Sequence, residues 1–390
     1  MTPTAGGQLA WVEGELDDMQ AAGLERRLLE LDGPPGPTVE LDGRTYILLG
    51  SNNYLDLAAH PAVVQGAIAA ARRFGAGAGA SRLLSGATPL QRELERGLAG
   101  LLRAQDALLF SSGYLANVAT VAALVGKGDE VFSDALNHAS IIDGCRLSGA
   151  RVTVYPHRDV DCLAQLLRSS TARRRLVVSD TVFSMEGSVA PVNELATLAG
   201  GADAMLLLDE SHALGVMGTD GAGLAAEIDF EGKIVMATLS KALGSAGGVI
   251  AGSAMLIRFL QHRARGFVFD TAPGPPAVGA ARAALEVMLA EPGRRQILLQ
   301  LTARLRNRLR AGDLRVPEGE TAIVPLLVAT PEASLAIAHG ARARGVIAFP
   351  IRPPSVPVGT SRLRLTVSAG FSEQMVDRAA DALVLAASQR

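Results

Sequence analysis

Cysteine is scarce in this chain of 390 residues. The two cysteines, Cys145 and Cys162, fall in segments predicted to be separate elements, and neither belongs to a CxxC or a Cys/His pattern. We therefore expect both thiols to be reduced and structural. The sequence predicts no metal site.

An excess of charge of either sign is also missing. The 37 Lys and Arg residues and the 39 Asp and Glu residues are interspersed, and the formal net charge is -2. This balance leaves no basic field that could hold nucleic acid or an anionic membrane. Any phosphate group must therefore be bound by a local site.

Long apolar runs are absent as well. No stretch approaches the ~18 consecutive apolar residues that a membrane-spanning helix needs. The segment Met1–Trp11 lacks a basic region followed by an apolar core, so it does not resemble a signal peptide. We expect a cytoplasmic protein.

The N-terminal segment, residues 1–55, is predicted to contain a helix and a hairpin. Residues Leu16–Leu31 carry apolar positions at helical spacing, and Gly33–Pro37 is rich in helix breakers. Two short β-type runs follow within Val39–Leu49, joined by the turn dipeptide Asp42-Gly43.

The rest of the chain is predicted to form two domains, because 390 residues with 48% hydrophobic content are too many for one compact core. Residues 56–275 alternate helical and buried-strand patterns, which indicates an α/β domain with a mostly parallel sheet and helices on both faces. Residues 276–390 predict a smaller α+β domain. The strands expected in the large domain are Ala107–Phe110, Glu130–Ser133, Arg151–Tyr155, Leu176–Ser179, Met205–Leu208, Ile234–Thr238 and Gly248–Ala251.

Two of these strands end in residues that together suit an aldehyde cofactor. Met205–Leu208 runs into Asp209, with His212 three residues further on, and Ile234–Thr238 is followed by Lys241. Taken singly, the acid could cap a turn, the histidine could pack beneath a loop and the lysine could be solvated. Together they supply an amine for a Schiff base and a carboxylate that keeps a pyridine nitrogen protonated. This pairing predicts a pyridoxal-phosphate site at the carboxyl ends of the strands.

A third motif could bind the cofactor phosphate. Residues Leu109–Asn117 read as a strand, a turn of small residues and the start of a helix. Free N–H groups and the helix dipole at such a start attract an anion. An ordinary serine-capped helix is the alternative interpretation.

A glycine-rich stretch, Gly75–Ala80, matches the G-x-G-x-x-A dinucleotide pattern. It follows the helical pattern Val63–Arg73 instead of a strand, and no acidic residue ends a second strand some twenty residues later. We therefore reject a dinucleotide site and expect a loop near bound substrate.

Taken in order, six motifs resemble the α-oxoamine synthases, a family of fold-type I pyridoxal-phosphate enzymes that condense an amino acid with an acyl thioester. The resemblance runs from about Leu24 to the C-terminus. The motifs are Ser51-Asn52-Asn53-Tyr54-Leu55, Ser81-Arg82-Leu83-Leu84-Ser85-Gly86, Asn137-His138-Ala139-Ser140, Val182-Phe183-Ser184-Met185-Glu186-Gly187, Asp209-Glu210-Ser211-His212 and Thr238-Leu239-Ser240-Lys241.

The resemblance implies a catalytic role for three residues. Lys241 would hold the cofactor as a Schiff base and act as the base on the amino acid. Asp209 would pair with the pyridine nitrogen. His138 would stack on the ring and polarise a substrate carbonyl.

Further residues are implied in cofactor binding. His212 would hydrogen-bond the phenolic oxygen of the ring, and Ser184 would help to fix the ring. Thr271 would reach the phosphate bound by the partner subunit of a homodimer, although Asp270 beside it is an unexpected negative charge. The residues around the phosphate would be Gly113, Tyr114 and Thr238.

Within the family, the stretch Ile351–Pro357 favours the member that joins L-alanine to a pimeloyl thioester, carried by coenzyme A or a carrier protein, in biotin biosynthesis. Arg364 would hold the alanine carboxylate with the help of Asn52. Arg26 and Ser355 match positions that meet substrate in that member.

Three departures weaken this assignment: serine at 355 where threonine is usual, glutamate at 186 where aspartate is commoner, and Phe267–Ala272 where a serine-rich stretch is expected. Family members that use glycine or serine share the core motifs and stay open as alternatives. A cofactor-binding regulator without turnover is the alternative from another class.

Overall fold

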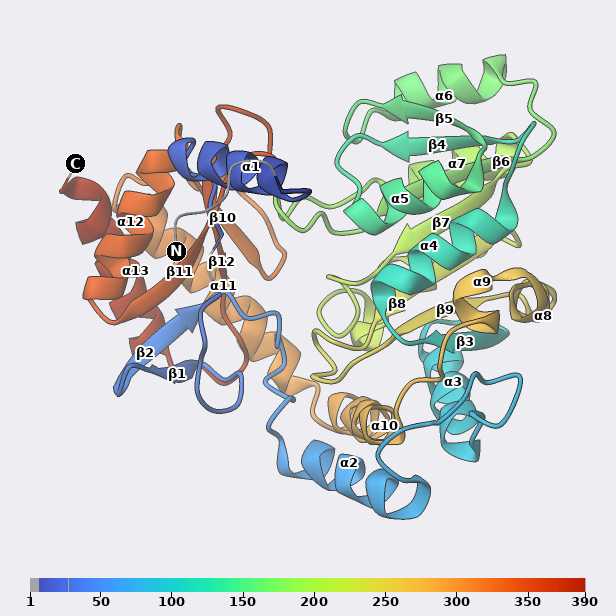
Figure 1. Cartoon of the computed structure of the whole chain (residues 1–390), viewed down its shortest axis with the longest axis horizontal. Helices are drawn as coiled ribbons and strands as arrows, with labels where there is room; N and C mark the ends of the chain where they lie inside the picture. Colours follow the sequence, from blue (N-terminus) through green and yellow to red (C-terminus); the bar gives the residue numbers. More distant parts are fainter. Residues whose placement is uncertain (1–6, 27, 390) are drawn as a thin grey trace.

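The structure, a computed structural model, describes residues 7–26 and 28–389. Met1–Gly6 and Arg27, which belong to the N-terminal segments considered above, lie outside the described residues, as does Arg390. Two β-sheets with their own helices make up the described chain, one on each side of Figure 1. Within this part of the chain no helix is long and apolar enough to cross a membrane.

The larger sheet has seven strands in the order β3-β9-β8-β7-β6-β4-β5. Its strands are β3 (Asp106–Phe110), β4 (Glu130–Asp134), β5 (Arg151–Tyr155), β6 (Arg175–Asp180), β7 (Met205–Asp209), β8 (Lys233–Thr238) and β9 (Gly248–Gly252). Strands β5, β4, β6, β7 and β8 pair in parallel, and β9 is antiparallel to both of its neighbours. The predicted mostly parallel sheet is therefore confirmed.

Helices cover both faces of this sheet, because its central strands are apolar on both sides. Leu206 and Leu208 of β7 belong to one buried cluster, and Leu207 between them belongs to the other. The first cluster packs against α2 (Pro61–Phe74), α3 (Pro89–Leu101), α6 (Val160–Ser169), α7 (Val192–Gly201) and α10 (Pro275–Ala290). The second packs against α4 (Gly113–Leu124), α5 (Ala139–Ser148), α8 (Ala254–Arg263) and α9 (Arg265–Val268). Two short 3-10 helices, η1 (Thr219–Gly221) and η2 (Ala225–Glu227), follow β7.

The smaller sheet joins segments from both ends of the chain. Its strands are β1 (Thr38–Leu41), β2 (Arg44–Leu49), β10 (Ile323–Leu327), β11 (Val346–Ile351) and β12 (Arg362–Thr366), in the order β1-β2-β11-β12-β10. Helices α11 (Gly293–Ala311), α12 (Pro331–Ala343) and α13 (Glu373–Ser388) pack with it. Because β2 pairs in parallel with β11, the residues just after β2 are held beside the C-terminal segment. The exact division of the chain into domains stays a prediction.

The predicted hairpin at 39–49 is confirmed. Strands β1 and β2 are antiparallel, with Leu41 opposite Arg44, so Asp42 and Gly43 form a two-residue turn. Both turn residues have positive φ, 51° and 70°. This is the geometry that an Asp-Gly dipeptide favours.

The predicted bounds of the N-terminal helix are wrong. The helix α1 spans Ala10–Ala21 instead of Leu16–Leu31, and none of its residues is buried. It ends because Gly23 takes a positive φ of 65°, which lets the Leu24 N–H donate to the Met19 carbonyl at 2.8 Å. The apolar spacing after Ala21 does not correspond to a helix. The helix α1 has no buried residue, so packing against a core does not determine where it ends.

Candidate active site

The site lies where β6, β7 and β8 end. In Figure 1 the arrowheads of β4 and β5 point from the larger sheet toward the smaller one. Asp180 and Asp209, the last residues of β6 and β7, are paired in register, and Lys241 follows three residues after the end of β8. The carboxyl ends of parallel strands thus bring together Asp209 and Lys241, as expected for this kind of sheet.

Lys241 faces His212. The amine Nζ lies 2.8 Å from His212 Nε2. Burial lowers the pKa of Lys241 to about 8, against the opposing effect of the Asp209 carboxylate. The tight turn after the lysine needs glycine at 244, where φ is 58° and a Cβ would collide with the backbone of Ala58. A larger fraction of Lys241 is therefore neutral near physiological pH than of a solvated lysine.

Asp209 is almost fully buried and held by two donors. Asn117 Nδ2 of α4 donates to Oδ2 at 2.8 Å, and the Ser211 backbone N–H donates to Oδ1 at 2.8 Å. Asn117 Nδ2 also lies 2.9 Å from Ser140 Oγ. These contacts fix the orientation of the carboxylate.

His138 caps the start of α5. The ring nitrogen Nδ1 lies 2.7 Å from Ser140 Oγ and accepts from the Ser140 backbone N–H at 3.2 Å, so Nε2 is the nitrogen left free. The Tyr114 ring meets it edge-on, with centroids 6.3 Å apart. Desolvation by the surrounding protein lowers the pKa of His138, so the ring is neutral at physiological pH.

Asp180 was not singled out from the sequence. The carboxylate accepts from the His138 backbone N–H at 2.7 Å, and the Asp180 N–H donates to Asn137 Oδ1 at 2.9 Å. Burial, and then the nearby Asp209 charge, raise the pKa of Asp180 well above its usual value. Of the two carboxyls, Asp180 is therefore the one that holds a proton.

The predicted phosphate end lies at the start of α4. Ser112 caps the helix by accepting from the Leu115 N–H at 3.1 Å. A Cβ on Gly113 would lie 3.1 Å from Thr238 Cβ, so a side chain at this position would crowd Thr238. Thr238 Oγ1 in turn lies 2.8 Å from Ser240 Oγ. Hydroxyls and helix N–H groups thus converge here, as an anion requires.

The other predicted residues near this corner are more exposed. The Tyr114 hydroxyl donates to Asp143. Thr271 is exposed, and its neighbour Asp270 accepts from Ser111 Oγ at 2.5 Å. The Asp270 carboxylate therefore contacts Ser111, two positions before Gly113, at the edge of the predicted phosphate site.

Arg364 reaches the site from β12. Its Nη1 donates to Asn52 Oδ1 at 3.0 Å, its Nε to the Ser184 carbonyl at 2.5 Å, and its Nη2 to the Tyr54 hydroxyl at 3.2 Å. Tyr54 is fully buried, and its hydroxyl also lies 2.6 Å from His212 Nδ1. The smaller sheet thus contributes directly to the surroundings of Lys241.

Arg26 and Ser355 lie together at the surface. Arg26 Nη2 lies 3.4 Å from Ser355 Oγ, across 329 positions of sequence. Nearby, Arg352 donates to the carbonyl of Gly23. The segment after α1 is therefore attached to the loop between β11 and β12.

This donor set fits pyridoxal phosphate. It offers an amine with a lowered pKa, a buried and oriented carboxylate, a neutral imidazole beside the amine and a glycine-lined corner with hydroxyls. Asn117 contacts the Asp209 carboxylate, and Asp180 accepts from the backbone of His138. Among residues 7–26 and 28–389 no group of His, Cys, Asp and Glu side chains could hold a metal ion.

Comparison with known proteins agrees with this geometry. The family model for aminotransferase class I and II matches residues 44–383. An 8-amino-7-oxononanoate synthase of Anaeromyxobacter dehalogenans is 48% identical over 375 residues, covering 96% of this chain and 94% of that protein. One of a Mycobacterium species is 43% identical over 396 residues and covers both chains fully. The chain belongs to the α-oxoamine synthases, within the aminotransferase class I and II family.

Solved structures of other α-oxoamine synthases have the same fold. A serine palmitoyltransferase of Sphingomonas wittichii superposes with a TM-score of 0.92 at 28% identity, covering 98% of this chain and 99% of that one. A serine palmitoyltransferase variant of S. paucimobilis with a bound PLP–myriocin aldimine gives a TM-score of 0.91 at 27% identity, with 98% of each chain covered. The predicted fold-type I architecture and pyridoxal-phosphate dependence are confirmed.

Three residues that line the site were missed as site residues: Tyr54, Asn117 and Asp180. Tyr54 belongs to a motif that carried the resemblance, but nothing local marks its hydroxyl as a link between distant residues. The signal for Asp180 was available, since it directly follows the predicted strand Leu176–Ser179, as Asp209 follows Met205–Leu208.

Proposed function

We propose that the protein catalyses the decarboxylative condensation of L-alanine with a pimeloyl thioester, giving 8-amino-7-oxononanoate, CO2 and a free thiol, as a step of biotin biosynthesis. The observation that carries the proposal is the convergence of Asp209 and Lys241, at the carboxyl ends of β7 and β8, with Arg364 of β12, in a chain whose relatives named 8-amino-7-oxononanoate synthase are 42–48% identical to it.

Each residue around the cofactor would have a separate role. When bound, pyridoxal phosphate supplies an aldehyde that links to an amine and a ring that accepts the electron pair released at the amino-acid Cα. Lys241 would hold the cofactor and, once displaced by the amino acid, take the Cα proton. Asp209 would keep the ring nitrogen protonated, and Asn117 keeps that carboxylate oriented. His212 and Ser184 would position the ring.

Arg364 is proposed to bind the alanine carboxylate. Its guanidinium is buried and donates to Asn52 and Tyr54, so it is fixed in orientation and can offer a two-pronged contact to a planar carboxylate. Holding this carboxylate fixes the Cα–H bond relative to Lys241. Asn52 would complete the contact through its side-chain amide.

His138 is proposed to act on the acyl substrate. The Nδ1 atom is engaged by Ser140, so Nε2–H is the free donor. A donor here would stabilise negative charge on the thioester carbonyl oxygen while the new C–C bond forms and the thiolate leaves. The carboxylate of the β-keto acid then leaves as CO2, and a proton returns to the same carbon.

Arg26 and Ser355 are proposed to bind the acyl chain. A guanidinium at the protein surface suits the free carboxylate at the far end of a pimeloyl group. The serine hydroxyl beside it, 3.4 Å away, would accept or donate a further hydrogen bond. The thioester carrier would then be coenzyme A or an acyl carrier protein in solution.

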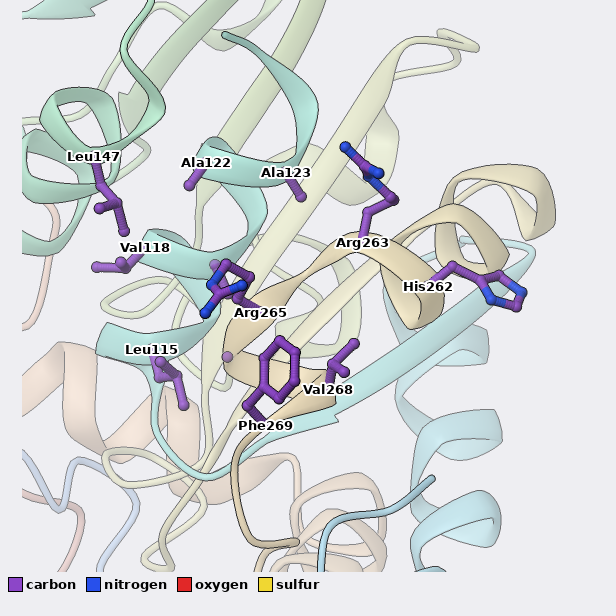
Figure 2. Close-up of a pocket in the computed structure, with 12 residues that line it drawn as sticks. Leu115, Val118, Ala122, Ala123, Leu147, His262, Arg263, Arg265, Val268 and Phe269 are labelled. Carbon is purple, nitrogen blue, oxygen red and sulfur yellow. The ribbon is translucent and has the colours of Figure 1, made fainter. Parts of the chain in front are cut away.

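We further propose a homodimer that shares its active sites. A groove of 520 Å³ runs between α4 and α9, and its lining contains no residue of the proposed catalytic site (Figure 2). Leu115, Leu147 and Phe269 point into it, and Phe269 is 70% exposed. A second copy would cover this apolar surface. Thr271, two residues from Phe269, would then reach the phosphate held by the partner.

A substrate matrix tests the proposed function. Purified protein with bound cofactor is offered L-alanine, glycine, L-serine or L-threonine, each with pimeloyl, acetyl, succinyl or palmitoyl thioester, and free thiol and CO2 are measured. Turnover is expected with L-alanine and a pimeloyl thioester. Preference for L-serine with palmitoyl thioester, or for glycine, would assign the chain to another branch of the family. If no substrate pair is converted, the result would favour a cofactor-binding regulator.

A further inference from the structure

Tyr54 lies between the proposed carboxylate-binding arginine and the histidine beside Lys241. Its hydroxyl oxygen is 2.6 Å from His212 Nδ1 and 3.2 Å from Arg364 Nη2. The other ring nitrogen, His212 Nε2, is 2.8 Å from Lys241 Nζ. An unbroken chain of hydrogen bonds therefore runs from β12 through Tyr54 to the turn after β8.

The direction of these bonds follows from the groups involved. A guanidinium only donates, so the Tyr54 oxygen accepts from Arg364. Burial raises the pKa of Tyr54, so its hydroxyl keeps a proton to donate. Asn52 Oδ1 is a poor acceptor for that proton, because it lies 3.3 Å away and already accepts from Arg364 Nη1. The nearer acceptor is His212 Nδ1.

His212 can accept at Nδ1 because its ring is neutral. Burial, together with the charges of Lys241 and Arg364 and the neighbouring His138, holds the pKa of His212 well below its usual value. A neutral imidazole carries one proton, so a ring that accepts at Nδ1 is protonated at Nε2.

We propose that Tyr54 is a positioning residue that donates to His212 Nδ1 and thereby fixes the ring proton on Nε2, the nitrogen that faces Lys241. Above about pH 8, where the Lys241 amine is neutral, the Nε2–H then donates to that amine in the cofactor-free protein, and it is placed to donate to the phenolic oxygen of the bound cofactor. The same hydroxyl accepts from Arg364. A carboxylate bound by Arg364 therefore affects the hydrogen bond between Tyr54 and His212. The kinetic consequence rests on the proposed function; the tautomer does not.

The direct test is nitrogen NMR of the cofactor-free protein labelled with ¹⁵N-histidine. The chain has six histidines, and the His212 signals are assigned from their loss in His212→Asn. At about pH 9, where the Lys241 amine is neutral, the wild-type ring is expected to be protonated at Nε2. In Tyr54→Phe this preference should be lost, with Nδ1 protonation appearing. A wild-type ring protonated at Nδ1 overturns the proposal, even if the variant does not fold.

A matched control removes a buried tyrosine hydroxyl elsewhere. Tyr155 is 1% exposed and lies on β5, the edge strand three positions along the sheet from β7. Tyr155→Phe should leave the His212 tautomer as in the wild type. The ionisable groups that face Lys241, namely Asp209, Asp180 and Arg364, are the same in both variants. An unchanged His212 signal in folded Tyr54→Phe overturns the proposal.

The kinetic test separates this role from simple packing. Loss of one hydrogen bond that orients a reacting group predicts a fall in kcat of about tenfold in Tyr54→Phe. KM for L-alanine should change less than about twofold, because Arg364 keeps its contacts to Asn52 and Ser184. A rise in KM with unchanged kcat would overturn the coupling. If the wild type condenses no substrate pair, the proposed function fails while the tautomer result stands on its own.

Discussion

Asp180 and Asp209 lie directly opposite each other at the ends of two neighbouring parallel strands. Both carboxyls are nearly inaccessible to solvent, at 3% and 2% exposure. Two adjacent buried carboxylates cannot both be ionised at low cost. Burial and the nearby Asp209 charge raise the pKa of Asp180 well above its usual value, so we expect the proton to reside on Asp180.

Asp180→Asn is therefore expected to preserve function, because an amide mimics a protonated carboxyl and can still accept from the His138 N–H. Activity should stay within about threefold of wild type. Asp209→Asn, the matched change across the strand pair, should lower kcat on the order of 100-fold, because it removes the charge that holds the ring proton. Steady-state kinetics of the two variants check this. Equal losses would contradict the assignment of the proton.

The stability of the protein should also depend on Asp180. A carboxyl whose pKa is raised on folding takes up a proton when the chain folds, so stability falls as pH rises above the unfolded value of about 4. In Asp180→Asn this fall in stability with rising pH should disappear. Urea unfolding should find the variant more stable than wild type at pH 8, with the difference shrinking toward pH 4. A variant less stable than wild type at pH 8 would refute the raised pKa of Asp180.

Capture of the cofactor by the cofactor-free protein should depend on pH through Lys241. Only the neutral amine attacks an aldehyde, and burial lowers the pKa of Lys241 to about 8. The rate of pyridoxal-phosphate binding, followed by absorbance between pH 6.5 and 9.5, should rise with pH and reach half its maximum near 8. A rate that keeps rising toward pH 10 would show an ordinary exposed lysine.

Asp270 is expected to weaken phosphate binding, since it brings a negative charge to Ser111 at the edge of the phosphate corner. Asp270→Asn keeps the hydrogen-bonding shape but removes the charge. Titration of the cofactor-free protein should show affinity for pyridoxal phosphate about fivefold higher in this variant, less at high salt. Asp381→Asn on the surface of α13 is the control. No gain over that control would mean that the carboxylate does not face the phosphate.

Arg26→Ala should change KM for one of the two substrates and not for the other. Removing a charge-assisted contact to the distal carboxylate predicts a rise of about 10- to 100-fold in KM for the pimeloyl thioester. KM for L-alanine should not change. If both KM values rise together, the arginine acts through the fold of the N-terminal segment instead of on the acyl chain.

Much of the fold follows from local pattern. The strands of the larger sheet are short apolar runs with β-type residues, and their predicted ends fall within one or two residues of those observed. The Asp42-Gly43 turn fixes its hairpin because both residues tolerate positive φ. The N-terminal helix could not be placed because none of its residues is buried, so its end depends on the single positive φ of Gly23.

Some residues of the site could likewise be predicted from local pattern, and others could not. Asp209 and Lys241 could be paired from the sequence because each follows a predicted parallel strand. Tyr54 could not, because its hydroxyl acts on residues 158 and 310 positions away. Asn117 likewise orients Asp209 across 92 positions, and only the packing of α4 on the sheet brings them together.

Lys241 can be tested as the covalent anchor with unusual clarity, because the chain has only three lysines, Lys127, Lys233 and Lys241. Lys233 is the natural internal control, since it is buried and donates to the carbonyls of Ala225 and Ile228. The holoenzyme is reduced with borohydride, digested and mapped by mass spectrometry. One pyridoxyl-modified peptide, carrying Lys241, is expected, with no covalent cofactor in Lys241→Ala. Modification of Lys127 or Lys233 with Lys241 unmodified would contradict the assignment of Lys241 as the anchor.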